Sequence, residues 1–148
     1  MATTPTFDPI FEHYLTGNVD DIKVYDPDDT ENRVLPLGQP WKVEIYWSLE
    51  GRFVTALCGK WKIILSIEGM GIRLEADLCV GEKDFGDVEA GSTRLIRKWK
   101  FTCNVPSDKV TEEGVYMLTT FVSFIDSLGV PMPMAGHTDE PLISFYTP

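Results

Sequence analysis

The densest set of side chains that could bind a ligand lies in the acidic stretch DDIKVYDPDDTEN, residues 20–32. Carboxylate and amide oxygens are the ligands that Ca²⁺ prefers, which makes this stretch a candidate metal site. The candidate ligands are Asp26, Asp28, Asp29 and Glu31. Counted from Asp26, an EF-hand loop would need glycine and glutamate where this chain has Glu31 and Leu37. We therefore favour a solvated turn, because Asp, Asn and Pro are typical turn formers.

Acid–base catalysis has a candidate in His137, which Asp139 and Glu140 follow closely in the segment AGHTDEP. A single histidine in a Pro/Gly-rich loop lacks the partnered nucleophile that hydrolytic sites need. The motifs GxSxG, HExxH and GxxxxGK[ST] do not occur in the sequence. We therefore expect a protein that is not an enzyme and that uses no cofactor.

Tryptophan rings could form a flat platform for a sugar. Trp47, Trp61 and Trp99 each share a period-two face with aliphatic or aromatic neighbours, and such a face is normally the buried one. These three rings are therefore predicted to be structural core residues. Trp41, which begins its strand directly after Pro40, is left as the aromatic residue that could face a sugar.

The three cysteines, Cys58, Cys79 and Cys103, are scattered, and no CxxC pair occurs. An odd number leaves at least one thiol unpaired within the chain, which is typical of a reducing compartment. Cys103 is in phase with Trp99 and Phe101, so we expect a buried, inert thiol there. A bridge between Cys79 and Cys103 stays an open alternative.

Period-two alternation of apolar and polar residues begins at Trp41 and predicts an all-β chain. The expected strands are Trp41–Glu50, Lys60–Glu68, Ile72–Val80, Arg94–Val105, Val115–Ile125 and Leu142–Tyr146, with short ones at Ile22–Tyr25 and near residues 85–88. The Pro/Gly-rich segment 126–141 is expected to be a long connection. Seven or eight strands without a convincing long helix indicate a β-sandwich.

Two parts are expected: an N-terminal extension with the acidic loop over residues 1–34, packed on or flanking the domain, and a sandwich domain over 35–148. The N-terminus has no basic residue before Lys23 and no long apolar run, so it is not a signal peptide as it stands. No segment approaches the length of a membrane span. We expect a soluble, cytoplasmic protein; a secreted form whose leader peptide has been removed stays an open alternative.

The charge is strongly acidic, with 13 basic and 23 acidic residues giving a net charge of −10. Such a surface repels phosphate backbones and anionic lipid, so nucleic acid and membranes are not expected partners. The same charge keeps the protein in solution and permits a basic partner.

The stretch EEGVYML, residues 112–118, is similar to the start of strand F in immunoglobulin-like domains. Glu112, Gly114, Tyr116 and Leu118 stand at the alternate positions where that family has an acidic, a small, a tyrosine and a core residue. The resemblance implies that the Tyr116 hydroxyl bonds back to nearby backbone and locks the preceding turn. It also implies that Trp61 is the core tryptophan of strand C.

Leu118 replaces the second cysteine of that family, and Ile45 or Trp47 stands where the first would lie. The inter-sheet disulfide of the family is therefore expected to be absent, as it is in fibronectin-like members. The resemblance implies a fold and carries no catalytic residues.

A partner surface is predicted from the strand 115–125, which is apolar on both of its faces. Met117 and Phe121 lie on one face, and Met132 and Met134 follow in the segment GVPMPMAG; methionine is common at adaptable contacts. The alternative is that other strands or the N-terminal segment cover this face.

We therefore predict a single antiparallel, immunoglobulin-like β-sandwich that is a non-catalytic protein-binding or assembly module, with a homodimer as one form of assembly. The alternative function is a carbohydrate- or calcium-binding sandwich that uses Trp41 or the acidic loop.

Overall fold

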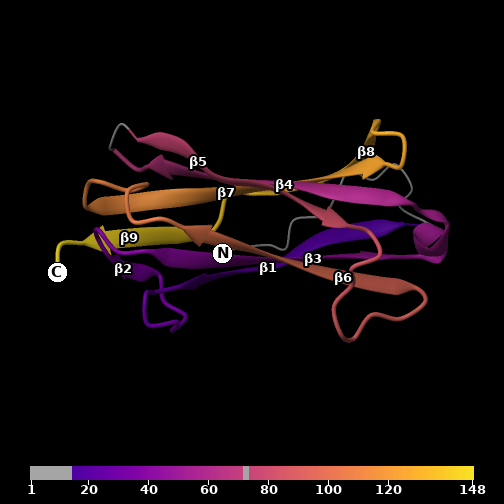
Figure 1. The fold of residues 1–148 in the computed structure, drawn as a ribbon, viewed down its shortest axis with the longest axis horizontal. Coiled ribbons are helices and arrows are strands. Elements are labelled where there is room, and N and C mark those ends of the chain that lie inside the picture. Colours follow the sequence, from indigo (N-terminus) through magenta and orange to yellow (C-terminus); the bar gives the residue numbers. More distant parts are fainter. Residues whose placement is uncertain (1–14, 72–73) are drawn as a thin grey trace.

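The computed structural model describes residues 15–71 and 74–148, which form nine strands and one short 3₁₀ helix. These elements are β1 (Thr16–Tyr25), β2 (Val34–Pro36), β3 (Trp41–Glu50), η1 (Arg52–Ala56), β4 (Gly59–Gly69), β5 (Glu75–Asp84), β6 (Ile96–Val105), β7 (Gly114–Asp126), β8 (Pro131–Thr138) and β9 (Leu142–Tyr146). The strands lie in two stacked layers (Figure 1). No helix within the described residues is long and apolar enough to cross a membrane.

The smaller sheet has three strands in the order β1-β3-β6, and the larger has six, in the order β2-β9-β7-β4-β5 with β8 also paired to β7. The all-β, two-sheet architecture predicted from the sequence is confirmed. The larger sheet is mixed, however, because β2 pairs with β9 in parallel, so the prediction of an antiparallel sandwich is wrong at this edge. Only three residues form this parallel pair, too few to show a period in the sequence.

Residues 16–25, which the sequence assigns to an N-terminal extension, form β1 and pair with β3 along its length. A register shift between Val19 and Asp21 marks a bulge, so the buried side chains of Val19 and Ile22 are three residues apart. The alternation of inward and outward side chains is broken at such a bulge, so the sequence pattern indicates a strand only over Ile22–Tyr25. The segment predicted to be a long connection likewise contains β8.

The core is centred on Trp47, Trp61 and Trp99, all fully buried between the sheets. The ring of Trp61 lies edge-on to both of the others, at centroid distances of 6.0 and 5.1 Å. The Trp99 indole N–H donates to the Phe85 carbonyl at 3.0 Å, which draws Phe85 against the cluster. Residues 85–88, predicted to contain a short strand, are therefore a loop whose aromatic residue packs into the core.

A disulfide joins Cys79 in β5 to Cys103 in β6, with 6.1 Å between the Cα atoms. Each strand is at the end of its own sheet, so the bridge links the two sheets. The expected free thiol at Cys103 is therefore wrong, and the Cys79–Cys103 bridge, which the sequence left open, is formed. The reason is a register shift opposite Leu65 and Ser66, which turns Cys79 inward towards Cys103. This bridge lies at other positions than the family's disulfide, which would need cysteines at Leu118 and at Ile45 or Trp47. Cys58 is free and exposed.

Tyr116 is fully buried, and its hydroxyl donates to the backbone carbonyl of Glu112, the bond that the resemblance implies. Burial, with the nearby charge of Glu112, raises the pKa of Tyr116. The turn before β7 is thereby tied to the strand that it precedes.

Candidate functional site

A row of apolar side chains crosses the outer face of the larger sheet from β5 to β8. Register places Val80, Ile64, Phe121 and His137 side by side on four neighbouring strands; we call these four residues the apolar row. Val80 is 61% exposed and Phe121 45%, so this row is not covered by the described chain. The predicted contact residue Phe121 is thus at an exposed position.

His137 extends the aromatic part of the row. Its ring stacks on Phe121 at a centroid distance of 4.5 Å and an interplanar angle of 26°. Its Nε2 lies 2.9 Å from Asp139 Oδ1, which also accepts a hydrogen bond from the Thr119 hydroxyl at 3.3 Å. The histidine that the sequence offers for acid–base chemistry therefore lies on an open sheet face against a phenyl ring.

The outward residues on either side of the apolar row are polar, and some of them pair across neighbouring strands. On one side, the Ser66 hydroxyl donates to Asp77 at 2.7 Å. On the other, Lys62 lies opposite Glu82, whose carboxylate also pairs with Lys60 at 2.8 Å. The row is therefore an apolar strip between hydrogen-bonded polar strips.

The other predicted contact residues lie apart from this row. Met117 is half-buried and lies opposite Leu142, two rows from Phe121. Met132 and Met134 belong to β8, and their side chains lie outside the described residues. Val80 could not be predicted as a contact residue from the sequence, because only the cross-strand register shows which residues lie beside it.

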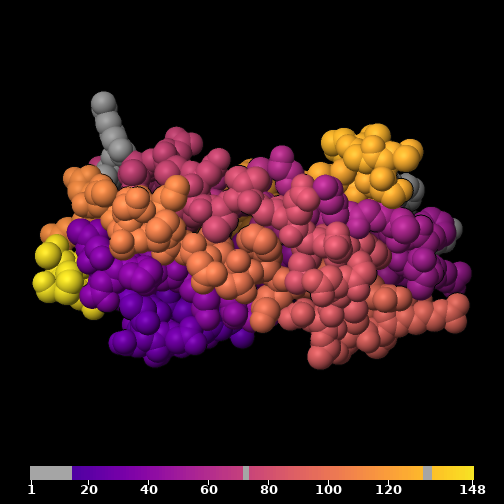
Figure 2. All heavy atoms as spheres, in the orientation of Figure 1, coloured from indigo at the N-terminus to yellow at the C-terminus, as the bar shows by residue number. Residues whose placement is uncertain are grey.

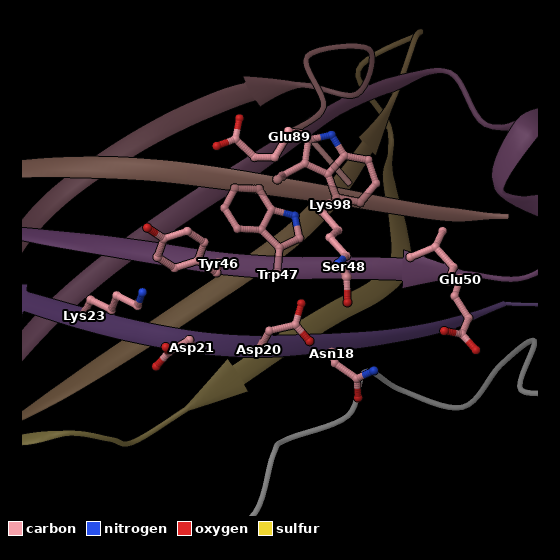
Figure 3. A pocket seen from close by; sticks show the side chains of 13 residues that line it. Asn18, Asp20, Asp21, Lys23, Tyr46, Trp47, Ser48, Glu50, Glu89 and Lys98 are labelled. Atoms are coloured by element: carbon pink, nitrogen blue, oxygen red, sulfur yellow. The ribbon is translucent and has the colours of Figure 1, made fainter. Parts of the chain in front are cut away.

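A polar groove of about 670 Å³ lies on the outer face of the smaller sheet, on the other side of the molecule. Its polar lining includes Asn18, Asp20, Tyr46, Ser48, Glu89 and Lys98. Glu89 comes from one side and Asn18 and Asp20 from the other, with Tyr46 and Ser48 between them (Figure 3). In the space-filling view, the gold atoms of β8 lie at the upper right and the indigo atoms of β1 at the lower left (Figure 2), although part of β8 also contacts β1.

Two local features form the walls of this groove. The bulge in β1 brings the consecutive carboxylates of Asp20 and Asp21 to its edge. The loop between β5 and β6 folds back onto β6, where the Glu89 N–H donates to the Lys98 carbonyl at 2.7 Å. The Lys98 N–H in turn donates to the Ser92 hydroxyl at 3.0 Å, so the loop is tied to the strand that it flanks.

Beside the groove, Glu44 accepts hydrogen bonds from two tyrosines. The Tyr46 hydroxyl donates to Glu44 Oε1 at 2.8 Å, and Tyr25 donates to the same carboxylate. Burial alone would raise the pKa of Glu44, but the bonds from Tyr46 and Tyr25 outweigh it and hold the pKa below its ordinary value. Burial and the bond to Glu44 raise the pKa of Tyr25 to about 12 and also raise that of Tyr46.

Lysines complete this tyrosine cluster. Lys23 Nζ lies 5.2 Å from the centre of the Tyr46 ring, and Lys42 Nζ lies 4.7 Å from that of Tyr25, both within cation–π range. Lys42 also binds Asp29 at 2.6 Å, and this bond raises the pKa of Lys42. The rings are thus held in place by the protein itself.

The acidic loop uses its carboxylates to hold the turn. Asp26 Oδ1 accepts hydrogen bonds from the backbone N–H groups of Asp28 and Thr30 at 3.0 and 2.9 Å, while Asp29 pairs with Lys42. Asp28 and Glu31 are exposed. Among residues 15–71 and 74–148, no three His, Cys, Asp or Glu side chains gather closely enough to hold a metal ion.

Trp41 does not provide a sugar platform. It is only 4% exposed, and its ring packs edge-on against Phe145 with 5.4 Å between the centroids. The first residue of β3 is therefore already inside the sandwich, and Pro40 rather than Trp41 faces solvent.

No family model and no curated protein sequence matches this chain. Among solved structures, it is similar to the C-terminal domain of wzt, with 13% identity, a TM-score of 0.56, and coverage of 89% of this chain and 74% of that one. A protein assigned as ApaA from Bordetella pertussis aligns over 99% of this chain and 98% of its own, with 13% identity and a TM-score of 0.31. The first similarity supports a β-sandwich fold and says nothing about function.

Proposed function

We propose that this chain is a non-catalytic protein-binding module and that the apolar row is its contact surface. The observation that carries the proposal is the alignment of exposed Val80 and Phe121 with Ile64 in one cross-strand row. Single exposed apolar side chains are ordinary, but a contiguous strip of them usually marks an interaction site. The His137–Asp139 pair borders the same strip, so we assign it to the contact rather than to catalysis.

The charges beside the row favour a basic partner over a second copy of the chain. Asp77, Glu82 and Asp139 flank the row together with Lys62, and Lys60 pairs with Glu82, so carboxylates outnumber lysines three to two. Two copies related by a twofold axis would bring these carboxylates towards each other, which costs free energy. A partner segment with aliphatic side chains between Lys or Arg residues would complement both the row and the net charge of −10.

The test is an unbiased peptide-display selection on the intact chain, followed by binding measurements with the enriched peptides. We expect peptides with apolar residues between basic ones, and at least tenfold weaker binding to Phe121→Glu. Leu128→Glu is the control, because Leu128 is 87% exposed in the turn before β8. Equal binding by the two variants would overturn the proposal. Sedimentation of the wild type tests the alternative that the partner is a second copy of the chain. A wild-type dimer that Phe121→Glu abolishes would overturn the basic partner and assign the apolar row to self-association.

We further propose that the protein matures in an oxidising compartment, in place of the cytoplasmic location expected from the odd cysteine count. The support is the Cys79–Cys103 bridge, since such bonds persist mainly outside reducing compartments.

A further inference from the structure

The polar groove has the size of a small-molecule site. Its volume of about 670 Å³ is within the range of roughly 300–1,000 Å³ that is usual for ligand pockets. It is open to solvent along the sheet, so a ligand longer than the groove could continue beyond it. Trp47 and Trp99, which are fully buried, close it from beneath.

The lining alternates hydrogen-bond acceptors and donors. Asp20 and Glu89 provide carboxylate acceptors on opposite sides (Figure 3), and Lys98 provides ammonium donors. Asn18 and Ser48 can both donate and accept. A ligand that satisfies all of these groups needs closely spaced groups that themselves donate and accept, as the hydroxyls of a saccharide do.

The same lining argues against other ligand classes. The carboxylates of Asp20, Asp21 and Glu89 repel phosphates and organic acids. Glu50 adds a fourth carboxylate to the lining, and Lys23 and Lys98 offset two of the four negative charges, which weakens the attraction for a free ammonium group or a divalent cation. Ala90 and Ile96 give the groove aliphatic lining, but charged groups stand around them, and covering those charges with a lipid chain would cost free energy.

The Tyr46 ring, which forms one wall of the groove, is held in its orientation before a ligand binds. Tyr46 is bound through its hydroxyl to Glu44 and lies under the ammonium group of Lys23. A ligand therefore meets a ring whose orientation is already set, and it need not supply the free energy to order that ring. The C–H groups of a pyranose can pack on such a ring while its hydroxyls face the carboxylates.

From these features we infer that the groove between β1, β3 and the β5–β6 loop binds a neutral saccharide. This site differs from the Trp41 platform suggested by the sequence, and it is independent of the apolar row. Glu89 and Asp20 accept hydrogen bonds from ligand hydroxyls, Lys98 donates to ligand oxygens, and Tyr46 packs against the ring.

The test is a glycan array that includes neutral, acidic and amino sugars, probed with the intact chain, followed by calorimetric titration of the strongest neutral glycan. Ser48→Trp fills the groove and should weaken binding at least tenfold. Ser123→Trp is the matched control, because Ser123 is also a half-buried outward serine, but on β7 in the other sheet. Glu89→Gln should weaken binding by about tenfold, as expected for the loss of a charged hydrogen bond.

Circular dichroism should show that each variant is folded, and Phe121→Glu should bind the glycan like the wild type, which separates this site from the apolar row. Absence of binding to any neutral glycan at millimolar concentration would overturn the inference. Equal binding by Ser48→Trp and Ser123→Trp would also overturn it. Binding of spermidine or of a nucleotide in the groove, with no neutral glycan bound, would assign it to another ligand class and overturn it as well.

Discussion

The outer faces of the two sheets follow the same alternating pattern and yet differ in chemistry. On the larger sheet, Val80, Ile64 and Phe121 align as an exposed apolar strip. On the smaller sheet, the equivalent outward positions hold polar and charged side chains around the tyrosines, and a groove lies beside them. Burial dictates only the inward half of each strand, so the outward half is free to differ between the sheets. Both proposed binding sites lie on these outward halves.

The largest expected effect concerns the interlayer that both faces share. Trp47→Ala should lower the free energy of unfolding by about 3–5 kcal/mol, because it removes a fully buried ring from between the sheets. Ser48→Ala, at the next residue on the outward face, should cost less than about 0.5 kcal/mol. Urea denaturation followed by circular dichroism measures both. Similar costs for the two variants would contradict the division into inward and outward faces.

An intermediate effect is expected from the bridge between the two sheets. The loop closed by Cys79 and Cys103 spans 24 residues, for which chain entropy gives a stabilisation of about 3 kcal/mol. The double variant Cys79→Ser/Cys103→Ser should therefore unfold at lower urea, whereas Cys58→Ser should not, since Cys58 is free and exposed.

The same double variant sharpens the comparison between the faces. The loop that carries Glu89 connects the two bridged strands, so amide exchange should quicken more in the groove wall than in β7 beside the apolar row. Uniform quickening over both faces would contradict a specific link between the bridge and the groove.

The smallest effect concerns ionisation on the smaller sheet. In the folded chain the pKa of Tyr25 is raised to about 12 and that of Tyr46 is also raised. Below pH 10 both tyrosines are neutral in the folded and unfolded states, so they add no pH dependence. Above that pH the unfolded chain ionises first, so stability should fall as pH rises from about 10 towards 12.

Tyr25→Phe should make this alkaline loss of stability less steep, and ultraviolet absorbance of tyrosinate should report a tyrosine that titrates late. Tyr146→Phe is the control, because Tyr146 is 45% exposed on β9 in the larger sheet. A Tyr25→Phe variant as sensitive to alkali as the wild type would contradict the hydrogen bond between Tyr25 and Glu44.

Much of the fold could be predicted from local pattern. The strand Trp41–Glu50 has the predicted bounds, and Leu142–Tyr146 does as well. The strands that were missed are those that local pattern cannot show. β1 contains a bulge, β2 has three residues, and β8 is rich in Pro and Gly.

The sites were less predictable than the fold. Phe121 could be named because its strand is apolar on both faces, but Val80 and His137 join it only through pairing with strands far apart in the sequence. The groove could not be named at all, since its residues come from β1, β3, β6 and a loop. Each contributing segment looks like an ordinary polar surface when read separately.

The sequence by itself determined which side chains face inward, because alternation along a strand is a local property and burial of apolar surface rewards it directly. Only the tertiary structure decided which outward residues become neighbours. That depends on strand order, and on register shifts such as those at Asp21 and opposite Leu65, which long-range pairing sets. The disulfide, the apolar row and the polar groove all arise at that level.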